Sequence, residues 1–321
     1  MILVTGATGF LGSALVDLLV REHLPVRALV RSPHKAAVLP DVVERAPGDI
    51  NDEASLRRAM DGCEGVMHLA AAVGLFTLEQ ARELNLGGTR RVLEAARRAG
   101  VRRFVYASSS AAIIAADGLV SETAPNRTAL TDSYSITKAE AEGLVFAAAA
   151  GGFEACIVNI VNGYGPCLAG PLSYNTALVA AARGDVEAIT DARVGWVLAE
   201  DVARGHLLAY ERGEPGKRYL LCGEVMAFPD ILERAAAIAG VPHHVRRLPA
   251  GTPVDAKAPF FYHRAASYGA LGGVRIDDSQ ARALGFRPRT VEEGLRITMP
   301  WLRDGLPAVS RQPSEQDAGT R

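Results

Sequence analysis

A serine, a tyrosine and a lysine are spaced in this chain so that they can exchange a proton with a carbonyl oxygen. Ser109 is followed by Tyr134 after 25 residues, and Lys138 follows Tyr134 by four. On a helix, the four-residue spacing places Tyr134 and Lys138 on one face, where the ammonium favours the ionised phenol. A free tyrosine titrates near pH ~10, and a neighbouring cation brings its pKa closer to neutral pH. In the alternative interpretation, Tyr134 only begins a helix and Lys138 is solvated.

A glycine-rich turn at the N-terminus has the spacing of a phosphate-binding loop. Gly6, Gly9 and Gly12 lie three residues apart, between a predicted strand at residues 2–5 and a predicted helix at residues 13–22. In such a turn the first glycine permits the tight bend, the second lets the backbone approach a pyrophosphate, and the third allows the helix to pack closely. The candidate cofactor-binding residues of this turn are Gly6, Thr8, Gly9, Phe10, Leu11 and Gly12.

The residues at the ends of the next two predicted strands bear on the choice of dinucleotide. Arg31 follows the strand predicted at residues 26–30, where a cofactor with a free ribose hydroxyl would normally meet Asp or Glu. A guanidinium suits a 2′-phosphate, and Ser32 and Lys35 can assist it, so we predict NADP in preference to NAD. Asp49, followed by Ile50, is placed to meet the adenine amino group, or else it caps the following helix. A solvated arginine is the alternative for Arg31.

The composition describes an ordinary globular chain that is large enough for two lobes. With 321 residues it exceeds the usual size of a single core, and its formal net charge of −1 gives no reason to expect nucleic acid. The four cysteines show no metal-ligand or paired spacing, so we expect reduced thiols and a cytoplasmic protein. No apolar run reaches the ~18 residues of a membrane span. His243 and His244 have no third ligand at metal spacing, so we predict no metal site.

Short apolar runs alternate with helical stretches in the first half of the chain. Further strands are predicted around residues 42–43, 65–69, 104–106 and 156–158, and helices at 54–60, 89–99 and 138–149. This alternation predicts a parallel sheet covered by helices on both faces, with ligands at the carboxyl ends of the strands. We place this domain at residues 1–165, a mainly substrate-binding lobe at 166–302, with some segments returning to the sheet, and a polar, disordered tail at 303–321.

These motifs together resemble the extended short-chain dehydrogenase/reductase family, which includes NAD-dependent epimerases and dehydratases, over about residues 1–302. The matching segments are residues 5–12, 68–71 and 85–89, followed by Ser109, Tyr134 and Lys138. The resemblance implies an α/β fold, a Rossmann-type doubly wound parallel sheet with a smaller C-terminal α/β substrate lobe. It also implies hydride transfer at the nicotinamide, with Tyr134 exchanging the proton, Lys138 binding the nicotinamide ribose and Ser109 polarising the substrate oxygen. Ser109 is chosen over Ser108 and Ser110 because it stands at the family's usual place.

The resemblance also implies further cofactor contacts and a mode of assembly. The implied cofactor-binding residues are Leu69, Ala70, Ala71, Asn85, Asn159 and Val161, together with Tyr134 and Lys138. Many members of the family have Arg-Pro where this chain has Asn159 and Ile160, although Asn159 is familiar from the branch that resembles dihydroflavonol reductases. Family members often form homodimers through the helices that correspond to residues 89–99 and 138–149.

The substrate side favours an apolar molecule over a nucleotide sugar. Many nucleotide-sugar epimerases carry an arginine and a histidine at the positions of Val194 and Leu198, so the usual diphosphate-recognising group is missing here. The candidate substrate-lining residues are Tyr164, Leu172, Tyr174 and Trp196, each of which can instead be core.

The sequence therefore predicts an NADPH-dependent reductase of a ketone or aldehyde, or an alcohol dehydrogenase in the reverse direction. Its partner is a small carbonyl or alcohol substrate, with no nucleic acid and no membrane. A nucleotide-sugar epimerase or dehydratase with tightly bound NAD is the alternative enzyme. A dinucleotide-sensing partner protein is the non-enzymatic alternative.

Overall fold

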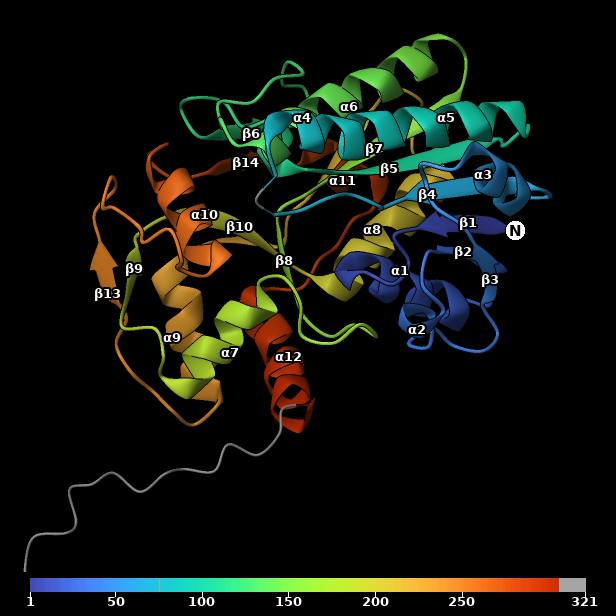
Figure 1. Cartoon of the computed structure of the whole chain (residues 1–321). Helices are drawn as coiled ribbons and strands as arrows, with labels where there is room; N and C mark the ends of the chain where they lie inside the picture. The colour runs from blue at the N-terminus through green and yellow to red at the C-terminus, as the bar shows by residue number, and fades with distance from the viewer. Residues whose placement is uncertain (75, 306–321) are drawn as a thin grey trace, which may run out of the picture.

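Seven parallel strands form the sheet on which the predicted catalytic residues lie. The computed structural model describes residues 1–74 and 76–305 (Figure 1). In spatial order the strands are β11 (Arg218–Leu221), β7 (Glu154–Ile160), β5 (Arg103–Ser109), β4 (Gly65–His68), β1 (Ile2–Thr5), β2 (Val26–Val30) and β3 (Glu44–Pro47). All neighbouring pairs are parallel. The strand order reverses between β1 and β4, which is where a doubly wound sheet binds its ligand.

Helices cover both faces of this sheet. In Figure 1 one face carries α3 (Glu53–Met60), α5 (Gly88–Arg98) and α6 (Ser133–Ala150), and the other carries α1 (Phe10–Arg21) and α8 (Ala199–Arg212). Side chains of the central strands alternate between the two cores, because successive strand residues point to opposite faces. Val4 packs with Leu15 of α1, whereas Leu3 packs with Val92 of α5. The predicted Rossmann-type α/β fold is confirmed.

The smaller lobe lies beyond the carboxyl ends of the strands (Figure 1). Its strands are β8 (Asn162–Tyr164), β9 (Ala188–Thr190), β10 (Arg193–Leu198), β12 (Glu224–Ala227) and β13 (Arg246–Leu248), and its helices are α7 (Asn175–Arg183), α9 (Phe228–Ile238), α10 (Phe260–Gly269) and α12 (Val291–Gly305). The chain returns to the large sheet at β11, and α11 (Ser279–Leu284) lies against that strand. The remaining elements are α2 (Pro33–Ala36), α4 (Leu78–Ala81), β6 (Leu119–Ser121), β14 (Arg275–Asp277), a π-helix at Arg82–Gly87 and a 3₁₀ turn at Ser110–Ala112.

The third predicted strand and the first predicted helix are displaced. The strand predicted around residues 42–43 is found as β3, and Val43 is a buried residue of the preceding turn. β3 is an edge strand, so it needs less apolar surface than a central one and its own sequence is a weak signal. Helix α1 begins at Phe10, three residues before the predicted start, because the extended Gly9 already serves as its N-cap.

Two further features bear on the predicted boundaries. Helix α12 ends at Gly305, so it includes the first three residues of the predicted tail, and the rest of that tail lies outside the described residues. Within the described part of the chain, no helix combines the length and apolar character needed to cross a membrane.

The glycine turn depends on two close backbone approaches. Gly6 has φ +73°, in the left-handed region, and a Cβ there would lie 2.7 Å from the backbone of Leu69 and Ala70. A Cβ at Gly12 would overlap the Gly6 carbonyl group. The turn therefore packs against both the end of β4 and the first turn of α1 without room for a side chain.

Replacing Gly12 by alanine should therefore destabilise the protein. We expect Gly12→Ala to lower the free energy of unfolding by about 1–3 kcal/mol, because the added methyl forces the turn apart. The measurement is chemical denaturation followed by circular dichroism. Gly151→Ala is the matched control, since its Cβ would meet its nearest atom, the Ala148 carbonyl oxygen, at 3.4 Å. Equal stability of the Gly12→Ala variant and the wild type would contradict this account of the turn.

Candidate active site

The three predicted catalytic residues come from two adjacent elements of the large domain. Ser109 is the last residue of β5, and Tyr134 and Lys138 lie in the first turns of α6. The helix begins here because Asp132 caps it, accepting a hydrogen bond from the Ser135 N–H at 3.0 Å. Tyr134 and Lys138 therefore lie on one helix, four residues apart, as the sequence analysis assumed.

The hydroxyl groups of Ser109 and Tyr134 interact at the carboxyl edge of the sheet. Burial raises the pKa of Tyr134, and a hydrogen bond with the Ser109 side chain and the charge of Arg264 oppose this rise. Both residues are half-buried. Ser108 is buried instead, and its hydroxyl donates to Glu142 at 2.5 Å. Among the three adjacent serines, the geometry supports the choice of Ser109.

Lys138, one turn further along α6, is buried against β5. Its side chain is buried, Nζ donates to the Ala107 carbonyl at 2.5 Å, and the ammonium lies 4.1 Å from the centroid of the Tyr106 ring. Burial lowers the pKa of Lys138 to about 7, and the nearby carboxylate of Glu142 opposes this decrease. The ammonium thus has a protonation equilibrium close to neutral pH, in the range where acid/base groups work best.

A buried carboxylate that the sequence analysis missed holds this catalytic helix against the sheet. Glu142 accepts hydrogen bonds from Arg218 at 2.9 Å, Asn159 at 2.6 Å and Ser108 at 2.5 Å. Glu142 and Arg218 are almost completely buried, with side-chain exposures of 0% and 4%. The network therefore joins α6 to β5, β7 and β11. The spacing in the sequence could have indicated Glu142, because it follows Lys138 by four residues, as Lys138 follows Tyr134.

Asn159 belongs to this network and not to an open cofactor surface. Its amide nitrogen also donates to the Ser109 carbonyl at 2.9 Å, so the side chain fixes the strand that carries the serine. Its amide oxygen is buried without a hydrogen-bond partner among the described residues. The Asn159 side chain is turned toward Glu142, so a cofactor contact at this position, which stays a prediction, would fall to its backbone.

The segment after β4 is held by two buried polar side chains. His68 bonds to Thr5 at 2.6 Å and to Thr89 at 3.2 Å, and burial lowers its pKa to about 3, so it is neutral at pH 7. Asn85 accepts from the Ala72 N–H at 2.7 Å and donates to Thr137 at 3.0 Å. Asn85 therefore joins the loop after β4 to Thr137, the residue before Lys138, and fixes the position of that loop.

Comparisons with known proteins show the family of the chain. The model of the NAD dependent epimerase/dehydratase family matches residues 2–222. The chain belongs to this family. Sterol demethylase protein B of Methylococcus capsulatus is 33% identical, covering 94% of this chain and 98% of its own. A dihydroflavonol 4-reductase-like protein of Synechocystis is also 33% identical, covering 94% of each chain. The solved structure of MoeE5 with UDP-glucose and NAD has 28% identity and a TM-score of 0.77, covering 95% of this chain and 99% of its own.

The family fixes the general chemistry of the site. The protein is an NAD(P)-dependent enzyme that acts on alcohol and carbonyl groups of small molecules. The glycine turn fits such a cofactor. Gly6 and Gly12 leave no room for side chains, so the backbone is tightly bent there. Helix α1 starts directly after the turn, and the N–H groups at its N-terminus favour a phosphate. Phe10 and Leu11 pack against Gly163 of β8, which links the turn to the smaller lobe.

The predicted adenine end of this epimerase/dehydratase cofactor site is an open hollow of about 550 Å³. Arg31 and Asp49 both line it, and their charged groups are 3.7 Å apart. The Arg31 side chain is 75% exposed, so a ligand phosphate can reach it. Asp49 does not cap α3, because Asp52 does, and Ser32 caps the short helix α2. Ile50 instead packs toward Gly88 of α5.

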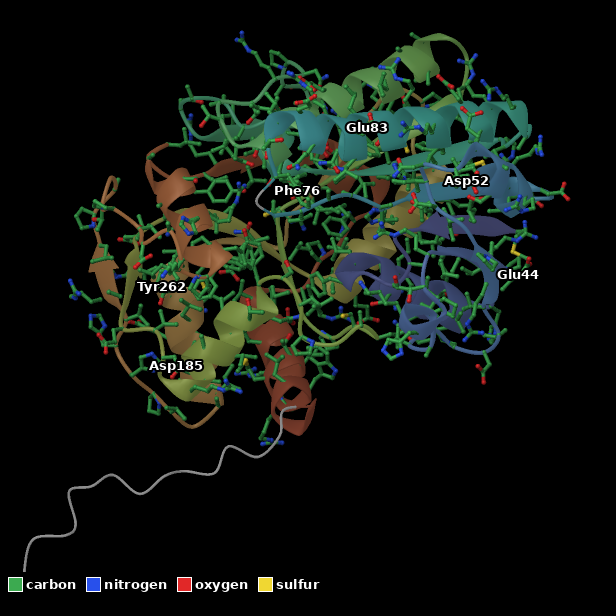
Figure 2. All side chains as sticks on the ribbon, viewed as in Figure 1. Glu44, Asp52, Phe76, Glu83, Asp185 and Tyr262 are labelled. Atoms are coloured by element: carbon green, nitrogen blue, oxygen red, sulfur yellow. The ribbon has the colours of Figure 1, made fainter. Side chains whose placement is uncertain are left out.

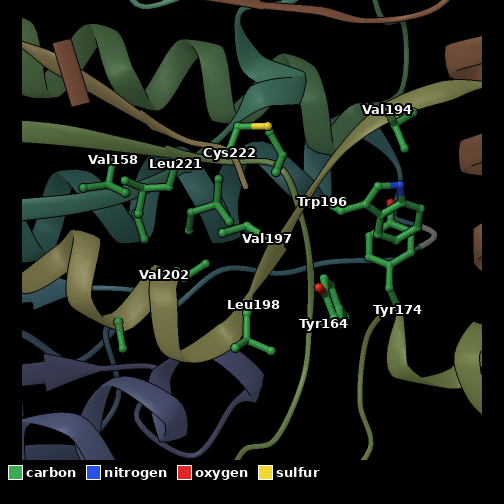
Figure 3. Packing of buried hydrophobic residues seen from close by; sticks show 14 of the residues in the cluster. Val158, Tyr164, Tyr174, Val194, Trp196, Val197, Leu198, Val202, Leu221 and Cys222 are labelled. Carbon is green, nitrogen blue, oxygen red and sulfur yellow. The ribbon is translucent and has the colours of Figure 1, made fainter. Parts of the chain in front are cut away.

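The predicted substrate-lining residues divide into buried and accessible ones. Trp196 and Tyr164 are both 1% exposed, and their polar atoms bind the backbone of Met226 and Val291. These two side chains are packed in the core of the smaller lobe, which agrees with the alternative interpretation of them as core residues. Figure 3 shows Tyr174 packed on Trp196, with ring centroids 5.4 Å apart. Tyr174 is 7% exposed and Leu172 is 44% exposed, so Leu172 presents the larger accessible surface.

Other apolar side chains are exposed where the two lobes meet. Phe260 is 41% exposed and lies 5.0 Å from the Tyr174 ring, centroid to centroid. Phe76, labelled in Figure 2, is 38% exposed, and its carbonyl accepts from Ser133 at the start of α6. Phe76 is thus tied to the start of α6, the helix that carries Tyr134, and Phe260 to the aromatic cluster around Tyr174.

Loss of the Glu142 carboxylate should destabilise the protein strongly. We expect Glu142→Ala to cost about 3–5 kcal/mol of unfolding free energy, because the Arg218 guanidinium would remain buried without its ion partner. The matched control is Glu140→Ala on the same helix, which loses a more exposed ion pair with Arg82 and should cost about 1 kcal/mol or less. Urea unfolding of the three proteins compares them directly. Similar losses for the two variants would contradict the role of the buried network.

Proposed function

We propose that this protein is an NADPH-dependent reductase of a ketone or aldehyde, which also oxidises the alcohol in reverse. The observation that carries the proposal is the position of Ser109 at the end of β5, with Tyr134 and the buried Lys138 in the first turns of α6. Burial raises the pKa of the Tyr134 phenol, and the Ser109 side chain is near enough to oppose this rise. These groups face the strand ends beside the glycine turn, where a dinucleotide of this family would lie. The dihydroflavonol 4-reductase-like relative supports a reductase of this kind.

In the proposed reaction, the protein's own residues hold and protonate the carbonyl oxygen. Bound NADPH supplies the hydride that reduces the carbonyl carbon. Ser109 donates a hydrogen bond to the substrate oxygen as negative charge develops on it, and Tyr134 transfers its phenolic proton to that oxygen. In this proposal the ammonium of Lys138 stabilises the phenolate that Tyr134 leaves, and it would bind the nicotinamide ribose on exchanging its contact with the Ala107 carbonyl.

An epimerase or dehydratase that recycles bound NAD is the second candidate, favoured by the likeness to the MoeE5 structure with UDP-glucose and NAD. The smaller lobe argues against it. Val194 and Leu198, which replace the expected arginine and histidine, are both buried, with exposures of 2% and 1%. The adjacent Arg193 donates to the Val225 carbonyl at 3.2 Å. Tightly bound NAD that co-purifies with the protein would favour this alternative over the reductase.

The phenol of Tyr134 should be required for turnover and dispensable for cofactor binding. We expect Tyr134→Phe to lower kcat for NADPH oxidation with a carbonyl substrate by about a hundredfold or more, because no proton donor remains. Quenching of protein fluorescence by NADPH measures binding, which should remain close to that of the wild type. Tyr262→Phe, on α10, is the control for loss of a tyrosine hydroxyl. A Tyr134→Phe enzyme with normal turnover would exclude the assignment.

The Arg31 side chain should select the phosphorylated dinucleotide. We expect Arg31→Ala to weaken NADPH binding by about 10- to 100-fold, which corresponds to the loss of a charge-assisted hydrogen bond of about 1.5–3 kcal/mol. NADH binding to the same variant is the internal control and should hardly change. Titration calorimetry with both dinucleotides gives the comparison. A wild-type protein that prefers NADH would refute the role of Arg31.

A further inference from the structure

An arginine of the smaller lobe contacts the N-cap of the catalytic helix. Arg264 lies on α10, and its Nη1 donates to the Asp132 carboxylate at 3.1 Å. The same carboxylate caps α6 by accepting from the N–H and the hydroxyl of Ser135, at 3.0 Å and 2.7 Å. Asp132 stands two residues before Tyr134. The ion pair therefore joins the smaller lobe to the helical turn that carries the catalytic phenol.

The guanidinium of Arg264 is held firmly and stays charged. Its Nη2 donates to the Tyr268 hydroxyl at 2.7 Å, and its central carbon lies 4.8 Å from the centroid of the Tyr268 ring. The side chain is only 17% exposed. Burial by itself lowers the pKa of Arg264, but interactions with Tyr268, Tyr174 and Asp132 raise it above its ordinary value overall. Such a cation carries a permanent charge at any pH at which the enzyme would work.

Charged and titratable groups approach the Tyr134 phenol from four elements. They are Ser109 and Tyr106 of β5, Asp132 at the N-cap of α6, Tyr174 at the N-cap of α7, and Arg264 and Tyr268 of α10. Lys138 lies one turn after Tyr134 on α6. Lys138 directs its ammonium to the Ala107 carbonyl. Arg264 and Asp132 are the two oppositely charged groups that affect the phenol. The charge of Arg264 lowers the pKa of Tyr134, and that of Asp132 raises it.

We propose that Arg264 is a positioning residue for Tyr134. Arg264 ties the N-terminus of α6 to the smaller lobe and places a fixed positive charge near the phenol. The proposal deepens the proposed function, since it assigns part of the activation of Tyr134 to a residue outside the Ser109, Tyr134 and Lys138 set. Because α10 belongs to the smaller lobe, the acidity of the phenol then depends on where that lobe sits. Substrate binding between the lobes is thereby coupled to proton transfer.

Two substitutions that remove opposite ends of one ion pair distinguish charge from simple support. Arg264→Met removes the positive charge and should raise the pKa of Tyr134 by about one unit, a tenfold change in its ionisation equilibrium. Asp132→Asn keeps a side chain that caps helices well but removes the negative charge, so it should lower that pKa. If the pair served only to hold α6 in place, both variants would loosen the same contact and change the pKa in the same direction.

The readout is the ultraviolet absorbance of tyrosinate, titrated in each background with and without the additional substitution Tyr134→Phe. The difference isolates Tyr134 and requires no turnover, so the test stands even if carbonyl reduction is not found. Arg264→Lys should restore most of the wild-type pKa, and Arg247→Met, which removes an exposed arginine of the smaller lobe, should leave it unchanged. If Arg264→Met does not fold, the other two variants give the test. The pKa of Tyr134 should then fall in Asp132→Asn and stay close to the wild-type value in Arg264→Lys.

Opposite shifts in Arg264→Met and Asp132→Asn, with recovery in Arg264→Lys, establish the role. Shifts of the same sign in the two variants, or a Tyr134 pKa that neither variant changes, overturn it. In the kinetic assay, the same variants should move the pH at which kcat is half-maximal in the direction of the spectroscopic pKa. A failure of the kinetic assay alone, with the spectroscopic shifts present, would count against the proposed function and not against Arg264.

Discussion

The burial of one carboxylate, Glu142, underlies the arrangement of the active site. An ionised carboxylate inside a protein is tolerated only when it is paired and fully hydrogen-bonded, and Glu142 meets this condition through Arg218, Asn159 and Ser108. These partners come from three strands, so the position of α6 relative to the sheet is fixed by charge as well as by packing. Lys138 lies one turn earlier on the same helix, and its pKa responds to the same carboxylate.

Helix α6 is held at its N-terminal end by one contact within the large domain and one with the smaller lobe. Asn85 fixes the loop after β4 to Thr137, and Arg264 fixes the N-cap of α6 to the smaller lobe. Tyr134 thus lies between a rigid attachment to the sheet and an attachment to a lobe that borders the substrate. Under the proposed function, the smaller lobe would act both on substrate binding and on the acidity of the phenol.

Much of the fold and the central chemistry could be predicted from the sequence, because they depend on local patterns. The turn around Gly6 and Gly12 requires residues without Cβ, and Tyr134 with Lys138 requires only helical spacing. β3 was misplaced because an edge strand needs little apolar surface. Partners far apart in the chain, such as Glu142 with Arg218, are set by tertiary structure, which spacing does not encode.

The substrate side shows the same limit of local patterns. Tyr164 and Trp196 are residue types that often line binding sites. Both are nevertheless buried here, and their polar atoms donate to backbone carbonyls of the smaller lobe. An aromatic residue in a lobe of this size is needed for its core, and a single sequence does not separate that need from ligand binding. Arg264 was missed for the converse reason, because a lone arginine in an aromatic helix has no motif until Asp132 is placed beside it.

The most direct test of the central claim is transfer of deuterium from NADPH labelled at the reactive carbon of its nicotinamide. The protein would be incubated with the labelled dinucleotide and a panel of apolar and aromatic carbonyl compounds, and the products analysed by mass spectrometry. The account predicts an alcohol that carries one deuterium on its carbinol carbon, with one dinucleotide oxidised for each alcohol formed. Unlabelled product with no net oxidation of the dinucleotide, or NAD that stays bound through every turnover, would contradict it.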